Sequence, residues 1–66
     1  MNFIMWAQEA LTWHGHDLGA IDGIWGRRTW RALLAFQHDN QLLQTGTFTQ
    51  ATIHALQMKR ANKRRS

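Results

Sequence analysis

A single run near the middle of the chain joins a tight turn to the start of a helix: residues 21–33, IDGIWGRRTWRAL. In the turn, the Asp22 side chain has backbone N–H groups of its own loop within reach, and Gly23 is free to adopt a positive φ. From Arg27 onward the apolar residues follow helical spacing, and we predict a helix that ends near Asp39. Its apolar side consists of Thr29, Ala32, Leu33 and Phe36.

The same pattern occurs again 23 residues further along the chain, where Gly46 matches Gly23 and Phe48 matches Trp25. The matching helical positions are Thr29 with Thr52, Ala32 with Ala55, and Leu33 with Leu56. The second copy predicts a connection over residues 41–48 and a third helix that begins near Thr49. Because two units are too few for a solenoid, which needs about three or more repeats, we expect a compact pseudo-symmetric pair packed on a first helix.

The first helix is predicted ahead of the turn. Its apolar residues recur at intervals of three and four and are Phe3, Ala7, Ala10, Leu11 and His14. Asn2 suits the N-cap position, and Gly15 suits a helix end that needs a positive φ. The sequence therefore predicts an all-α fold: a compact three-helix domain over residues 1–58 with two structured Gly-containing loops.

Size and composition limit what can hold this fold together. The chain has 66 residues, enough for one domain, and a domain of this size buries only about 60% of the surface of its unfolded chain. There is no Cys, so no disulfide or thiolate metal site can act as a staple. We expect the four Trp and three Phe to contribute much of the core, because each large aromatic side chain buries about 150–250 Å².

The positive charge is concentrated at the C-terminal end. The net charge is +4, but five of the eight basic residues lie in residues 59–66. Residues 1–58 carry three arginines against four acidic residues, a balance of −1. We interpret residues 59–66 as a basic, flexible tail, either a solvated end or a contact to an anionic polymer such as teichoic acid, lipid headgroups or nucleic acid.

The sequence shows no signal peptide and no transmembrane segment. Its first residues lack a basic stretch, and Gln8 and Glu9 interrupt the apolar run. No stretch approaches the roughly 20 apolar residues that a membrane span requires. If the protein works outside the cytoplasm, we expect a route other than a standard export signal.

Taken together, these motifs resemble the peptidoglycan-binding domain family, the small three-helix modules attached to cell-wall hydrolases such as amidases and lysins, and to transpeptidases. The resemblance runs from Ala10 to Leu56. It is strongest in the Asp-Gly-x-aromatic-Gly loop of residues 22–26 and the Thr-x-x-Ala-Leu-x-x-Phe-Gln helix of residues 29–37. Thr45 and Thr49 stand where the family often has Asp and Gly, so the second turn is expected to differ in shape.

The resemblance implies a non-catalytic module that binds peptidoglycan, through a stem peptide or a glycan, and that works at the cell wall or in a bacteriophage particle. The family's modules normally accompany a catalytic domain, and these residues contain none. Related folds also serve as protein-interaction modules, because a fold alone does not establish a function.

Two tryptophans are candidates for ligand binding. Trp25 follows the turn and either stacks on a sugar or fills the core as Phe48 would. Trp30 follows Thr29 at a position that varies in the family, which implies partial exposure. An exposed indole offers an apolar face and one N–H donor, which suits glycans and protein interfaces alike.

Four charged residues complete the candidate ligand-binding set. Arg27, Arg28 and Arg31 crowd the start of the second helix, where cations oppose the helix dipole unless an anion compensates. Arg can hold a carboxylate through two hydrogen bonds, and peptidoglycan stems carry carboxylates. The alternative is a solvated positive face. Asp22 either accepts hydrogen bonds from a ligand or bonds backbone N–H groups in its own loop.

The sequence offers no catalytic, metal or cofactor site. The only Ser is Ser66 and the only Glu is Glu9, so no nucleophile is paired with a base. His14 and His16 with Asp17 are the nearest approach to a zinc-ligand group, but no helical ligand pair accompanies them. We therefore expect no enzyme activity, no metal and no cofactor.

Two functions remain open from the sequence. The first is a cell-wall binding module. We interpret its small size and the missing export signal as an indication that a phage encodes it. The second is a structural protein or interaction module that docks onto another protein chain in a virion or similar assembly. In that case Trp6, Trp13 and Trp30 would be the interface anchors, and the basic tail would meet an acidic partner.

Overall fold

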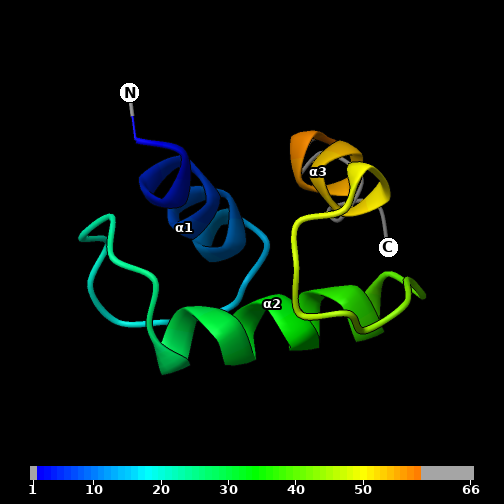
Figure 1. Ribbon diagram of the computed structural model, residues 1–66, viewed down its shortest axis with the longest axis horizontal. Coiled ribbons are helices and arrows are strands. Elements are labelled where there is room, and N and C mark those ends of the chain that lie inside the picture. The colour runs from blue at the N-terminus through cyan, green and yellow to red at the C-terminus, as the bar shows by residue number, and fades with distance from the viewer. Residues whose placement is uncertain (1, 59–66) are drawn as a thin grey trace.

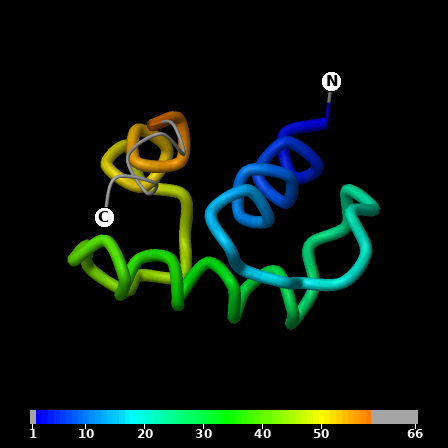
Figure 2. Tube along the Cα trace, turned by 180° about the vertical axis from the view of Figure 1, so that it is seen from behind, coloured from blue at the N-terminus to red at the C-terminus, as the bar shows by residue number. Residues whose placement is uncertain are grey.

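The computed structural model describes residues 2–58, which form three α-helices and no strand. The helices are α1 (Phe3–Trp13), α2 (Arg27–Asp39) and α3 (Gln50–Gln57). In both views α2 runs along one edge of the molecule, and α1 and α3 lie next to each other on the same side of α2 (Figure 1 and Figure 2). The predicted all-α, three-helix fold is confirmed. The predicted basic tail, residues 59–66, lies outside the described residues.

The helices begin where the sequence places suitable caps. The Asn2 side chain accepts a hydrogen bond from the Met5 N–H at 3.1 Å, and the Thr49 hydroxyl accepts one from the Thr52 N–H at 3.2 Å. Each bond satisfies one N–H group that the first turn of a helix leaves without a partner. At the start of α2 the N-cap is Gly26, which provides no side-chain hydrogen bond.

The core lies where the three helices meet and consists mainly of aliphatic side chains. Its buried members are Leu11, Leu18, Ala32, Phe36 and Leu56. Phe36 is the one aromatic ring that is fully buried within residues 2–58. The expectation that the aromatic residues contribute much of the core holds only in part: Trp6 and Phe48 pack against the core while partly buried, but Phe3, Trp13, Trp25 and Trp30 are exposed. Three short helices keep most of their side chains close to the surface.

A buried glutamine on α1 holds the loop that leads into α2. The Gln8 side chain is 1% exposed. Its amide oxygen accepts from the Gly23 N–H at 2.8 Å. Its amide nitrogen donates to the Ile24 carbonyl at 3.1 Å and to the Thr29 hydroxyl at 3.0 Å. A further contact of that nitrogen, at 3.2 Å, reaches the Asp22 carboxylate. The Gln8 side chain therefore holds both the loop at residues 22–24 and the first helical turn of α2.

A second buried glutamine, on α2, holds the loop that leads into α3. The Gln37 amide oxygen accepts from the Gly46 N–H at 3.0 Å. Its amide nitrogen lies 3.0 Å from the Thr47 carbonyl and 3.0 Å from the Thr52 hydroxyl, and 3.1 Å from the Thr45 hydroxyl. These partners correspond one by one to those of Gln8, at positions 23 residues later in the chain.

The expected difference in shape at Thr45 is not found in the hydrogen bonds of the two turns. Asp22 accepts from the N–H two residues later, that of Ile24, at 2.9 Å. The Thr45 hydroxyl accepts likewise from the Thr47 N–H at 3.1 Å. The hydroxyl oxygen thus takes the place of the carboxylate oxygen, because both accept hydrogen bonds and both Asp and Thr can bond the backbone N–H two residues later.

Candidate ligand-binding site

Trp25 and Trp30 line one groove together, which we call the aromatic groove. Its lining residues are Ile4, Trp25, Trp30, Thr45, Gly46, Thr47 and Phe48, and its volume is about 510 Å³. The exposed fractions of the two tryptophans are 44% for Trp25 and 43% for Trp30. The groove therefore brings together, on one surface, two of the six residues that the sequence predicted.

Each tryptophan is positioned by one of the two loops. Trp25 lies two residues beyond Gly23, and its ring meets Phe48 in a T-shaped contact with centroids 5.7 Å apart. Trp30 lies against Gly46, where an added Cβ would be only 2.7 Å from the indole Nε1. Gly46 has a φ of +74° and is buried, so glycine is required there both for the backbone conformation and for the approach of the ring.

Trp25 packs against a neighbouring ring but is not buried in the core. Its ring packs against Phe48, which itself contacts Phe3 at 5.1 Å. Nearly half of the Trp25 side chain nonetheless remains open to solvent. The residue is thus both part of the packing at this end of the molecule and accessible to a ligand.

The arginines line two hollows that are separate from the aromatic groove. Arg28 and Arg31 line a hollow of about 520 Å³, which we call the cationic hollow, together with residues that include His16 and Asp17. Arg27 and Arg28 line a smaller one of about 320 Å³ that also includes Asp22. Within residues 2–58, no ion pair joins these arginines to an acidic side chain.

The start of α2 carries positive groups that form no ion pair within residues 2–58. The first turn of α2 contains no acidic residue, and its N-cap provides no side-chain acceptor. The N–H groups of that turn and the adjacent guanidinium groups therefore add their positive charges. The Arg28 side chain packs directly over Gly19, where an added Cβ would clash with the guanidinium.

Asp22 serves its own loop. Its Oδ1 atom accepts from the Ile24 N–H at 2.9 Å and from the Gln8 amide at 3.2 Å. These bonds, first that from Ile24 and then that from Gln8, hold the pKa of the Asp22 carboxyl below its ordinary value of 3.8. The structure therefore gives Asp22 a role in shaping the turn between α1 and α2.

The six predicted residues do not converge on one pocket. Trp30 and Arg28 are two positions apart on α2, and side chains at that spacing point to different sides of a helix. Arg28 and Arg31 are three positions apart and share a side, as their common hollow shows. The candidate site is therefore a surface around the first turns of α2, with an aromatic and a cationic part.

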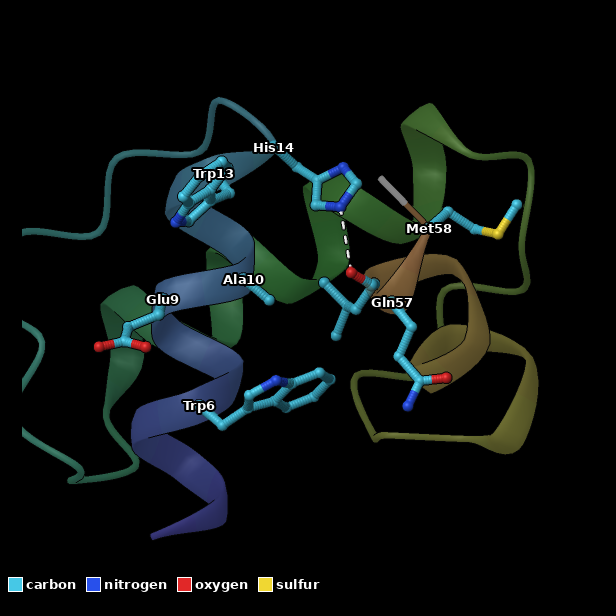
Figure 3. Close-up of a pocket in the computed structure, with 8 residues that line it drawn as sticks. Trp6, Glu9, Ala10, Trp13, His14, Gln57 and Met58 are labelled. Carbon is cyan, nitrogen blue, oxygen red and sulfur yellow. Dashed lines mark hydrogen bonds between the residues drawn. The ribbon is translucent and has the colours of Figure 1, made fainter. Parts of the chain in front are cut away.

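A third region, the cleft between α1 and α3, was not among the predicted ligand-binding residues. It has a volume of about 430 Å³ and is lined by Trp6, Glu9, Ala10, Trp13, His14, Leu56, Gln57 and Met58. Figure 3 shows Trp6 and His14 pointing from α1 toward α3, while Glu9 points away from it. The His14 Nε2 atom lies 3.3 Å from the Leu56 carbonyl oxygen, a contact that links the two sides of the cleft.

The chain matches the profile of one protein family, described as "Putative peptidoglycan binding domain", over residues 1–56. It belongs to this family. The match covers α1, α2 and all but the last residue of α3, and it includes all six candidate residues. No match was found among curated proteins or among solved structures.

The two histidines near the end of α1 both pack edge-on against Phe36, with ring centroids 5.0 Å away for His14 and 6.0 Å away for His16, but their polar contacts differ. His14 contacts the Leu56 carbonyl, whereas His16 lies 3.4 Å from the Asp39 carboxylate. Residues 2–58 contain no group of three potential metal ligands. No helix in this part of the chain is long and apolar enough to cross a membrane.

The residues that sequence reasoning missed are the two glutamines. Gln8 lines the hollow of Arg27 and Arg28 and contacts Asp22, and the two glutamines position the loops that carry Trp25 and border Trp30. A signal was present in the sequence, because each is a polar residue within the apolar side of a helix. A polar side chain buried there must find hydrogen-bond partners.

Proposed function

We propose that this chain is a non-catalytic module that binds peptidoglycan through the surface around the first turns of α2. The observation that carries the proposal is the presence of two half-exposed indoles and three arginines without acidic partners in the same region of a domain of this family. The ligand-binding residues we propose are Asp22, Trp25, Arg27, Arg28, Trp30 and Arg31.

Arginine suits the acidic parts of peptidoglycan. A guanidinium group binds a carboxylate through two parallel hydrogen bonds, and peptidoglycan stem peptides carry carboxylates. Arg28 and Arg31 line one hollow, so two guanidinium groups are within reach of one anionic group. Since neither forms an ion pair within residues 2–58, although Asp17 lines the same hollow, an anionic ligand would relieve the repulsion between them and the α2 dipole.

Asp22 contributes mainly through the loop. Its bonds to Ile24 and Gln8 fix the turn from which Trp25 emerges. Its Oδ2 atom makes no hydrogen bond within the described residues, and we propose that this oxygen accepts a hydrogen bond from the bound polymer.

Binding rather than cleavage is the proposed role. The sequence contains no Cys and has its only Ser at position 66. Since few groups converge in each hollow, we expect modest affinity for a single site. Sacculi present many identical sites, and linkage to a partner or multiple copies would raise the retention by effective concentration.

The test is co-sedimentation with purified sacculi from which teichoic acid has been removed. Wild-type protein is expected in the pellet at moderate salt, whereas Trp30→Ala and Arg28→Ala should each weaken retention by about tenfold, as loss of an interface anchor does. Trp13→Ala removes an exposed indole from the cleft between α1 and α3 and serves as the control. No retention of the wild type would overturn the proposed function. Retention of Trp30→Ala and Arg28→Ala equal to that of the wild type would overturn the proposed site.

A second candidate function is docking onto another protein. The observation that favours it is the cleft between α1 and α3, which Trp6, Trp13 and Met58 line. Light scattering of the purified protein discriminates between the two candidates. A stable oligomer or larger assembly that Trp13→Ala dissolves would favour docking, whereas a monomer that binds sacculi favours the cell-wall function.

A further inference from the structure

We infer that the aromatic groove binds the glycan strand of peptidoglycan, and that it does not bind the stem peptide. The inference rests on the proposed function and goes beyond it by assigning one chemical component of the polymer to one surface. It is drawn from the charge, the donors and the exposure of the residues that line the groove.

The charge of the groove excludes a stem peptide as its natural occupant. None of its seven lining residues carries a charge. A stem peptide bears carboxylates, and some bear free amines, which would lose hydration in this groove without gaining a partner of opposite charge. A strand of N-acetylated sugars instead has apolar C–H faces, hydroxyls and amides, all of which suit neutral aromatic walls.

The two indoles supply unused hydrogen-bond donors. Within residues 2–58, neither the Trp25 nor the Trp30 Nε1–H donates a hydrogen bond. An indole N–H finds an acceptor when it is buried, so a ligand that covers these rings must provide oxygen atoms. Sugar hydroxyls and acetamido carbonyls supply such acceptors along the whole length of a strand.

The position of the rings is fixed before any ligand arrives. Trp25 is held edge-on against Phe48, with an angle of 72° between the two rings. Trp30 lies against Gly46, which is buried and tied to Gln37 through its N–H. Because the rings need little ordering on binding, more of the contact energy remains for affinity.

The size and openness of the groove suit a polymer. Its volume of about 510 Å³ lies within the range of about 300–1,000 Å³ typical of small-molecule sites. Nearly half of each indole is exposed, so a chain can lie across the groove and extend beyond it. The cationic hollow is lined from another side of α2, where the carboxylates of an attached stem would find Arg28 and Arg31.

The experiment uses the two products of one digestion. An amidase that cuts between the glycan and the stem releases free stem peptides and glycan strands that keep a lactyl carboxylate on each muramic acid. Neutral oligomers of N-acetylglucosamine are therefore titrated beside the strands. Titration calorimetry of the full chain should show binding of the strands. Trp25→Ala and Trp30→Ala should each weaken that binding by about tenfold, whereas Trp13→Ala, in the cleft between α1 and α3, should leave it unchanged.

A competition measurement on the wild-type protein guards against variants that fail to fold. Soluble oligomers of N-acetylglucosamine should displace the wild type from sacculi, and released stem peptides should not compete at the aromatic groove. Retention on sacculi without any binding of glycan strands or oligomers would overturn this inference and leave the proposed function standing. Loss of retention on sacculi together with loss of glycan binding would overturn both this inference and the proposed function. A dimer that Trp30→Ala dissolves would also overturn it, because a second copy would then occupy the groove.

Discussion

The side-chain amide of Gln8 donates a hydrogen bond to the Thr29 hydroxyl at 3.0 Å and so ties α1 to the first turn of α2. The same amide group binds the backbone at Gly23 and Ile24. Trp25 follows these residues directly, and Thr29 precedes Trp30. The orientation of the proposed ligand surface therefore depends on a residue that lies inside the molecule.

Replacement of Gln8 by Ala is expected to lower the free energy of unfolding by about 2–3 kcal/mol, because it leaves several polar groups of the loop without partners. Gln37→Ala should have a similar effect at the second loop. Gln44→Ala is the matched control, since Gln44 is exposed and makes one bond, to the Leu34 carbonyl. Urea denaturation measures the free energy of unfolding of all three variants. A loss at Gln8 no greater than at Gln44 would contradict the role we assign to it.

Replacement of Gly46 by Ala should destabilise the domain by about 2 kcal/mol or more, because a side chain at positive φ costs about 1–2 kcal/mol and the new Cβ meets the Trp30 ring. The added atom would lie 2.7 Å from the indole Nε1. Gly26→Ala provides the comparison, since an added Cβ there meets nothing within 4 Å. At Gly26, an N-cap position, we expect the substitution to lower the free energy of unfolding by less than about 1 kcal/mol. Equal losses of stability for Gly46→Ala and Gly26→Ala would contradict the prediction.

The lowered pKa of Asp22 predicts a pH dependence of stability. A carboxyl whose pKa is lower in the folded state stabilises the fold above its ordinary value of 3.8, and this contribution is lost as the pH falls through the folded-state pKa. Asp22→Asn keeps an oxygen acceptor and removes the titration. The stability difference between wild type and Asp22→Asn should therefore shrink between pH 7 and pH 3. A difference that stays constant over this range would show that the carboxylate charge has no such role.

The arginines should make binding to sacculi sensitive to salt. Raising the ionic strength from about 0.01 M to about 0.15 M shortens the Debye length from about 30 Å to about 8 Å, which weakens the attraction between exposed guanidinium groups and carboxylates. Retention of the wild type should fall over this range. The fall should be shallower for Arg28→Ala combined with Arg31→Ala. An identical salt dependence for both proteins would place the anionic contact elsewhere, with the basic segment 59–66 as the next region to test.

Much of the fold could be predicted because the helices are marked at both ends and along one side. Asn2 and Thr49 are strong N-cap residues, and both cap the helices that follow them. The apolar spacing of α2 gave its bounds at Arg27 and Asp39. The exposure of Phe3, at 45%, was not predicted, because periodicity cannot show that the first turn of a helix extends past the core.

The site could be predicted less well than the fold. Trp25 and Trp30 do share a groove, but no sequence pattern predicted that Phe48 and Gly46, from the second loop, complete it. The hydrogen bonds of Gln8 and Gln37 span long separations along the chain, and local patterns carry no information about such partners. The separation of Trp30 from Arg28 follows from helical geometry alone, once the helix is known to include both.

The most direct test of the proposed site is a titration of the ¹⁵N-labelled protein with soluble peptidoglycan fragments, followed by NMR. The four indole N–H signals are separate reporters, two in the aromatic groove and two in the cleft between α1 and α3. We predict that the signals of Trp25 and Trp30 shift with added fragments and that those of Trp6 and Trp13 stay in place. Shifts confined to Trp6 and Trp13, or no shifts at all, would contradict the account.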